Sequence, residues 1–324
     1  MSMQDYVVLY GEKKHEDILI LKNIFINTKK IALGWTELDY TNNMKIIEEL
    51  INKKIEQIIF WGLEIGWDKL IKTIKERFSN IKVKVICNTN DSLLYYEYER
   101  KNFFDMLELS KERLIDDIAF LRKGQYETYK TLGYRCSYLR ENYKLENKNM
   151  IYKTDNKEIQ IGIYPLNYTW DKNIFNQLCI PKFIENSTLN YNCLDSRMKD
   201  FLTTMNIKAN DDNIEEICEE SLVQTIVKND VIVATSFTEY VHPIFFISME
   251  LGIPCLIGNT SEFFDKNEKL KRFIVSTAED NPIINSKMID IIINNKEEII
   301  DLYNEWKDEY NLICEKSIEK FLKL

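Results

Sequence analysis

Short runs of β-branched and aromatic residues alternate along this chain with longer stretches in which apolar residues recur every three or four positions. In the first half, stretches with helical spacing such as 43–55 and 99–114 separate short runs at 6–10, 30–34, 57–61, 82–87 and 116–121. The first period is typical of buried strands and the second of amphipathic helices. Their alternation predicts a parallel sheet covered by helices on both faces, which is a Rossmann-like domain.

The same alternation restarts after a polar stretch at 144–158 that has neither period and is the best candidate for an interdomain connection. Strands are predicted at 159–164, 181–186 and 230–236, and helices at 170–180, 193–205 and 213–229. The tail from Lys296 to Leu324 has the apolar spacing of a long amphipathic helix. The pattern therefore predicts an α/β protein with two Rossmann-like domains, at 1–148 and 149–300, and a C-terminal helix at 301–324 that packs back across them.

Composition and charge exclude several classes of protein. The formal net charge of −9 argues against general affinity for nucleic-acid phosphates. The basic stretch at 69–78 indicates at most peripheral membrane contact, and a solvated helix face is the simpler interpretation. The first residues do not have the pattern of a signal peptide and no apolar segment is long enough to span a membrane, so we expect a cytoplasmic protein.

Cysteine and histidine usage predicts no metal site. The seven cysteines are far apart without a C-x-x-C pair, and the chain has only two histidines. The sequence also lacks GxxxxGK[ST], HExxH and GxSxG, and it has no GxGxxG after the first strand. ATP hydrolysis, zinc proteolysis, serine hydrolysis and dinucleotide redox chemistry therefore lack their usual residues.

The stretch "DVIVATSFTEYVHPIFFISMELGIPCLIGNTSEFF" carries the most informative motif. It resembles the signature of the family 4 type of retaining glycosyltransferase, with matches at Ser236, Glu239, Gly252 and Pro254. The resemblance implies the GT-B architecture of two Rossmann-like domains. It also implies that Glu239 positions a nucleotide-sugar donor at the carboxyl end of a parallel strand, where ligands of open α/β sheets collect. Capping of a helix start is the alternative role of Glu239, and of Ser236 and Thr238.

The same resemblance assigns donor binding to further residues of this stretch and leaves one position unmatched. Gly258 and Asn259 fall in a loop expected near the diphosphate. The spacing of His242, three residues from Glu239, lets it orient that carboxylate or replace a lost polar contact, and packing in the core is the alternative. The family's second Glu falls on Ile247, and Glu250 lies about 60° around a helix from that direction. The donor is then held differently from the family pattern, or the site is weakened or inactive.

A second match is "IGIYPLNYTWDKNIFNQL", which resembles the strand, loop and helix that open the second domain in a bacterial subgroup of the family. It places Lys172, followed by Asn173, where a cation usually meets the donor diphosphate. A lysine there would stabilise the leaving diphosphate as charge builds on it. The alternative is an exposed lysine without a role, and the Arg that usually precedes the Lys is missing from 164–169.

The resemblance is thinner in the first half. Within "IDDIAFLRKGQYETYKTLGYRCSYLRENY", Arg122 and Lys123 are predicted at the cleft edge, with a solvated loop as the alternative. Two residues near the amino end, Gly11 and His15, are predicted on the acceptor side, with Gly11 alone in a loop that is richer in glycine in the family. His15 either contacts a sugar hydroxyl or is the first-turn residue of an ordinary helix.

The resemblance thus predicts a hexosyltransferase-type enzyme that transfers a sugar from a nucleotide diphosphate, with UDP-sugars favoured and no further cofactor, with retention. The expected acceptor is a protein, a polysaccharide or a lipid-linked sugar. The alternative is a catalytically silent GT-B-like subunit that binds or stabilises a partner transferase. A homo-oligomer is equally compatible with the sequence.

Overall fold

The computed structural model divides the chain into two compact units, each with its own parallel sheet. Unit 1 comprises Met1–Glu141 and Ile313–Leu324, and unit 2 comprises Asn142–Leu312. Within these units the structure describes residues 5–12, 24–25, 28–34, 36–141, 157–165, 169–192, 195–212, 214, 218–238, 243–258, 264 and 267–323.

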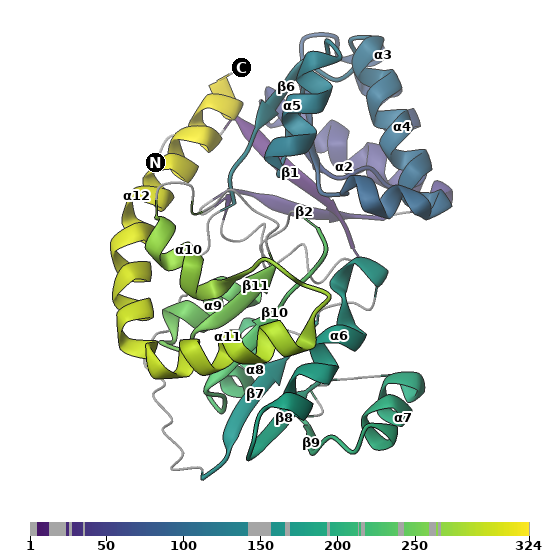
Figure 1. Ribbon diagram of the computed structural model, residues 1–324. Coiled ribbons are helices and arrows are strands. Elements are labelled where there is room, and N and C mark those ends of the chain that lie inside the picture. The colour runs from purple at the N-terminus through teal and green to yellow at the C-terminus, as the bar shows by residue number, and fades with distance from the viewer. Residues whose placement is uncertain are drawn as a thin grey trace. The chain divides into compact units, whose positions relative to one another are not determined.

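The sheet of unit 1 has six parallel strands in the order β2-β1-β3-β4-β5-β6. Figure 1 labels β1, β2 and β6 of this sheet. These strands are β1 Tyr6–Gly11, β2 Lys30–Leu33, β3 Gln57–Trp61, β4 Lys82–Cys87, β5 Asp117–Phe120 and β6 Cys136–Tyr138. The helices are α2 Tyr40–Asn52, α3 Trp67–Arg77, α4 Glu97–Lys111 and α5 Lys123–Thr131, with 3-10 turns η1 Glu37–Asp39 and η2 Asp91–Tyr95. The strand order reverses between β1 and β3, which places a topological switch point there.

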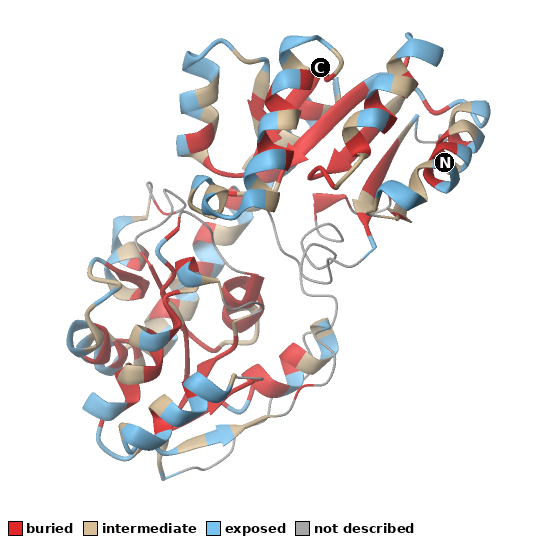
Figure 2. Cartoon of the chain, turned by 90° about the vertical axis from the view of Figure 1, so that its right-hand side faces the viewer, coloured by how far each residue is buried: buried red, intermediate tan, exposed pale blue. Residues whose placement is uncertain are grey.

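Burial explains why the central strands of unit 1 read as continuous apolar runs. Ile58, Ile59 and Phe60 of β3 are all 0 % exposed, although successive side chains of a strand point to opposite faces. Both faces of the sheet are therefore covered, and the strands are coloured as buried along most of their length in Figure 2.

The sheet of unit 2 also has six parallel strands, in the order β12-β11-β10-β7-β8-β9. Its strands are β7 Ile159–Ile163, β8 Ser187–Tyr191, β9 Ala209–Asp211, β10 Val231–Ala234, β11 Cys255–Gly258 and β12 Val275–Ser276. Its helices are α6 Ile174–Cys179, α7 Ser196–Thr204, α8 Glu219–Ile226, α9 Pro243–Glu250, α10 Glu268–Ile274 and α11 Pro282–Asn294, with 3-10 turns η3 Trp170–Lys172 and η4 Ile180–Phe183. Two parallel, helix-covered sheets confirm the predicted fold class.

The last helix, α12 Lys296–Lys323, contributes to both units because the boundary at residues 312 and 313 falls within it. Its first half packs on α9 through aromatic side chains. The rings of Phe245 and Tyr303 meet edge to face at 6.0 Å, and those of Phe246 and Tyr310 stack at 6.3 Å. Since every residue of α9 from 243 to 249 is buried, α9 is a core helix of unit 2.

Two predictions of secondary structure were wrong in detail. The run 181–186 is not a strand: Pro181 lies in the first positions of the 3-10 turn η4, Asn186 adopts a positive φ of 53°, and the strand follows at Ser187. The helix predicted at 170–180 is broken at Asn173, whose φ is 57°. The helical spacing predicted from Lys296 onward is confirmed, because α12 begins at Lys296.

Candidate functional site

The candidate site lies at the topological switch point of unit 2, where β10 and β7 pair side by side. At such a point the loops that follow the two strands diverge to opposite faces of the sheet and leave a crevice for ligands. Tyr164 follows β7 and Ser236 follows β10, so the strand order brings together two segments that are more than seventy positions apart in the sequence.

A cavity of about 20 Å³ occupies this position. Its polar lining comes from Lys172, Gln177 and Ser236, and the rest of its lining is mainly apolar, from Tyr164, Pro165, Ile174, Val233, Ala234 and Ile244. The volume suffices for about one water molecule. The Lys172 side chain is 12 % exposed, which contradicts the alternative of an exposed lysine.

Hydrogen bonds of the backbone hold Lys172 in a tight turn ahead of α6. The Lys172 N–H donates to the Thr169 carbonyl at 3.0 Å, and the Gln177 side-chain amide donates to the Lys172 carbonyl at 2.5 Å. Asn173 tolerates the left-handed conformation that ends this turn because its short side chain forms local hydrogen bonds. The lysine is therefore presented from a well-defined backbone.

The Asn173 side chain is engaged within the protein. Its amide nitrogen donates to the carbonyls of Thr235, at 2.9 Å, and Glu279, at 2.7 Å, while its oxygen accepts a hydrogen bond from Asn176 at 2.6 Å. These contacts tie the start of α6 to the end of β10 and to the segment before α11. Asn173 thus has a clear structural role, and its predicted role in donor binding stays a prediction.

Asp171, which the sequence analysis did not select, is the most buried charged residue of this turn, at 0 % exposed. Its backbone carbonyl accepts a hydrogen bond from the Phe237 N–H at 2.8 Å, and its Oδ2 lies 3.9 Å from the Lys172 Nζ. Thr238, 7 % exposed, donates its hydroxyl to the same Oδ2 at 3.5 Å. Asp171 thereby links the turn before α6 to the turn after β10.

Tyr164, a second residue that the sequence analysis missed, forms one wall of the cavity, and two hydrogen bonds hold its hydroxyl in place. The hydroxyl donates to Asp212 Oδ2 at 2.9 Å and accepts from the Asn229 amide at 3.0 Å. Burial and the Asp212 carboxylate raise the pKa of Tyr164 well above its usual value, so the phenol stays neutral. Gly162 gives this ring its room: a Cβ there would lie 2.6 Å from Tyr164 Cε2 and 2.5 Å from Ile232 Cδ1.

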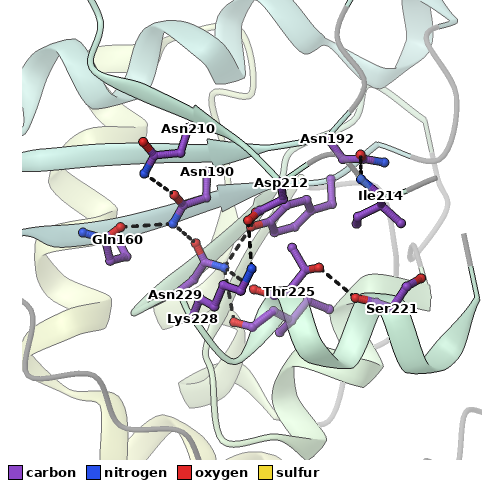
Figure 3. Close-up of polar contacts among 12 residues, drawn as sticks. Gln160, Asn190, Asn192, Asn210, Asp212, Ile214, Ser221, Thr225, Lys228 and Asn229 are labelled. Carbon is purple, nitrogen blue, oxygen red and sulfur yellow. Dashed lines mark hydrogen bonds and ion pairs between the residues drawn. The ribbon is translucent and has the colours of Figure 1, made fainter. Parts of the chain in front are cut away.

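A network of amide side chains from β7, β8, β9 and the segment between α8 and β10 supports Tyr164 (Figure 3). The Asn210 amide donates to Asn190 at 3.0 Å, and the Asn190 amide donates to Asn229 at 2.9 Å and to Gln160 at 3.1 Å. At the other end Lys228 pairs with Asp212 at 3.0 Å. Buried polar groups with satisfied hydrogen bonds hold a unique arrangement, so the network makes this wall of the cavity rigid.

Ile247, at the position of the family's second Glu, and nearby Glu250 both make their contacts within unit 2. Ile247 is 0 % exposed within α9. The Glu250 carboxylate accepts hydrogen bonds from the Tyr303 hydroxyl and the Lys307 ammonium of α12, both at 3.0 Å. Burial and Glu250 raise the pKa of Tyr303 well above its usual value. Glu250 therefore anchors α12 to α9 and does not take the place of a donor-binding carboxylate.

The structure gives the positions of only some of the remaining residues predicted to bind the donor, and their roles stay predictions. Ser236 and Thr238 lie directly after β10, and Gly258 is the last residue of β11, the next strand along the same carboxyl edge. Glu239, His242 and Asn259 lie outside the described residues, as does His15.

In unit 1 the predicted residues share the carboxyl edge of the sheet. Gly11 ends β1, and Arg122 and Lys123 follow β5. Arg122 is only 6 % exposed, so the alternative of a solvated loop does not hold for it. Glu64, which the sequence analysis missed, is 3 % exposed beside the switch point, accepts a hydrogen bond from the Tyr98 hydroxyl, and would lie 3.0 Å from a Cβ at Gly11.

The described part of the chain shows neither a metal site nor a membrane-spanning helix. No group of three or more His, Cys, Asp or Glu side chains there is arranged to hold a metal ion. None of the described helices is both long enough and apolar enough to cross a bilayer.

No protein-family model matches the sequence, and a sequence search of curated proteins finds no match.

Comparison with solved structures finds glycosyltransferases that share the fold over nearly the whole length of this chain. HepE of Anabaena, in complex with UDP and glucose, has a TM-score of 0.68 at 10% identity and covers 99% of this chain and 100% of its own. Sucrose-phosphate synthase of Thermosynechococcus elongatus has a TM-score of 0.71 at 10% identity, covering 99% and 98%. A UDP-forming α,α-trehalose-phosphate synthase of Burkholderia xenovorans has a TM-score of 0.61 at 10% identity, covering 99% and 98%. At these identities the comparison shows a shared fold, the GT-B fold.

Proposed function

We propose that this protein is a glycosyltransferase of the hexosyltransferase type that uses a nucleotide-diphosphate sugar, with a UDP-sugar favoured, and transfers the sugar with retention. The observation that carries the proposal is Lys172, whose side chain lines the cavity at the switch point of unit 2. The fold adds support, because HepE, a similar structure, is bound to UDP, to UDP with glucose and to UDP-glucose in separate crystals.

In this proposal the Lys172 ammonium faces the donor diphosphate and stabilises the charge that builds on it as the bond to the sugar breaks. A positive group held in place before the reaction contributes strongly to such a step, because it needs no reorganisation in the transition state. Ser236 and Thr238, in the turn after β10, bind the donor from the other side of the crevice, and Glu239 positions the sugar. The acceptor is a protein, a polysaccharide or a lipid-linked sugar, and the reaction is placed in the cytoplasm.

The proposal is tested by calorimetric titration with UDP, GDP and their hexose conjugates, followed by donor hydrolysis with whichever conjugate binds. We expect the wild type to bind UDP. Lys172→Ala should lower the affinity for UDP about tenfold or more, because this loss is typical when a charge-assisted contact is removed. Exposed Lys182 of η4 serves as the matched control, and Lys182→Ala should bind UDP as the wild type does. Absence of binding to every nucleotide, or equal binding by Lys172→Ala, would contradict the proposal.

A further inference from the structure

Asp171 is a charged side chain whose position the proposed reaction does not yet explain. It lies in η3 directly before Lys172 and is 0 % exposed. Burying an ionised carboxylate is costly unless paired groups compensate for the lost water. A buried carboxylate of this kind therefore needs charged or polar groups close to it.

The contacts of Asp171 fall into two separate groups. The backbone carbonyl receives the hydrogen bond from the Phe237 N–H at 2.8 Å, and any residue at this position would provide that carbonyl. The carboxylate Oδ2 faces the Lys172 ammonium at 3.9 Å and the Thr238 hydroxyl at 3.5 Å. The identity of the side chain therefore matters for Lys172 and Thr238, whereas the link between the two turns already exists in the backbone.

The other carboxylate oxygen supports this division. Asp171 Oδ1 is buried and has no hydrogen-bond partner among the described residues. A side chain kept only to complete the local hydrogen bonds would not leave one oxygen unsatisfied, because that costs stability. What remains is the action of the negative charge on Lys172, in a setting where little water screens it.

We infer that Asp171 is a positioning residue, which holds the Lys172 ammonium at the cavity and aligns it with the Thr238 side of the crevice before the donor arrives. Lysine has a flexible four-carbon stem, so fixing its end in advance removes part of the ordering cost of binding a diphosphate. Because the Asp171 carboxylate is buried, it acts through Lys172 and does not touch the substrate. The inference rests on the proposed function, since it takes the diphosphate as the group that Lys172 binds.

The test is a double-mutant cycle with Asp171→Asn, Lys172→Ala and the double variant, with UDP and uridine as the probes in calorimetry. Asn keeps the shape of the side chain and removes its charge. We expect Asp171→Asn to lower the affinity for UDP about tenfold, which is within the range found for coupled neighbours. The affinity for uridine should stay unchanged because uridine has no phosphate. In the Lys172→Ala background, Asp171→Asn should have no further effect. Asp290→Asn, an exposed aspartate of α11, is the matched control and should change neither affinity.

Four results would overturn the inference while leaving the proposed function intact. An equal loss of UDP and uridine affinity indicates a structural role, and losses that multiply in the double variant indicate independent residues. Unchanged UDP affinity indicates that the Asp171 charge does not act on Lys172, and tighter UDP binding indicates that the carboxylate repels phosphate. If the wild type binds no UDP, the proposed function fails and the inference fails with it. Should Asp171→Asn not fold, Asp171→Ser provides a second variant without the charge: it should weaken UDP binding and leave uridine binding unchanged, and equal losses of affinity for the two ligands would again overturn the inference.

Discussion

Lys84 is a fully buried lysine in the middle of β4, and its environment predicts an unusual dependence of stability on pH. Its ammonium donates to the backbone carbonyls of Phe321 and Leu322 in the last turn of α12 and lies 5.1 Å from the Phe321 ring. Burial lowers the pKa of Lys84 from 10.5 to about 8, and the Asp117 carboxylate opposes that shift in part.

The sign and the size of the effect follow from this shift. Below pH 8 both the folded and the unfolded chain carry the proton. Between pH 8 and 10.5 the folded chain loses it while the unfolded chain keeps it, so the free energy of unfolding rises with pH. A shift of about 2.5 pH units, at about 1.4 kcal/mol for each, predicts a rise of up to about 3 kcal/mol.

The thiols of buried Cys87 and half-buried Cys136 change the free energy of unfolding in the opposite direction over part of the same pH range. Burial raises the pKa of Cys87 to about 12 and of Cys136 to about 11, from 9.0. The unfolded chain therefore releases these protons first, and stability falls above pH 9. The measurement must for this reason compare the wild type with Lys84→Met, in which the thiols are unchanged.

The assay is urea unfolding, followed by far-ultraviolet circular dichroism, at intervals from pH 7.5 to 10.5. The difference in the free energy of unfolding between wild type and Lys84→Met should rise by up to about 3 kcal/mol over this range. Exposed Lys45 of α2 is the control, and the difference between wild type and Lys45→Met should stay flat. A flat difference for Lys84→Met as well would refute the reasoning, because it would mean that the ammonium keeps its usual pKa.

Three further substitutions test the packing around the candidate site. Ile247→Glu should lower the free energy of unfolding, measured by urea unfolding, by about 3 kcal/mol or more, because it places a carboxylate at a position that is 0 % exposed. An equally stable variant with tighter UDP binding would show that position 247 faces the donor. Gly162→Ala should cost about 1–3 kcal/mol through overpacking against Tyr164, Ile232 and Asn229, and a neutral effect in the same assay would mean that the Tyr164 ring has room to move. Tyr164→Phe should cost about 1–3 kcal/mol by leaving Asp212 and Asn229 without the hydroxyl, yet UDP affinity should stay unchanged because the ring remains; weaker UDP binding would place the hydroxyl in the site.

The strands and most helices could be predicted because their pattern is a direct consequence of burial on a sheet. The runs at 57–61 and 82–87 correspond to β3 and β4 because side chains on both faces of these strands are covered. The run 181–186 misled because Pro181 and Asn186 decide the local backbone against the apolar pattern. The spacing of apolar residues does not show the effect that a single Pro or a single Asn with positive φ has on the backbone.

The candidate site was predictable only where a motif marks it. Lys172 was selected because its segment resembles a family motif; the structure places its side chain at the cavity, and its role in binding stays a prediction. Asp171, Tyr164 and Glu64 were missed, although each is next to or near a residue that was selected. An acidic or aromatic residue in a loop gives no signal of its own until its partners are known, and those partners, such as Thr238 and Asp212, are far away along the chain.

The sequence by itself determined the fold class of this protein, because alternating apolar periods dictate strands and helices and their order dictates two parallel sheets. It also determined which loops follow which strands. Only the tertiary structure decided that Ile247 belongs to the core, that Glu250 anchors α12, and that Lys172 and Ser236 line one cavity. The physical reason is that burial and charge pairing depend on contacts between distant segments, and such contacts exist only once the strand order has placed β7 beside β10.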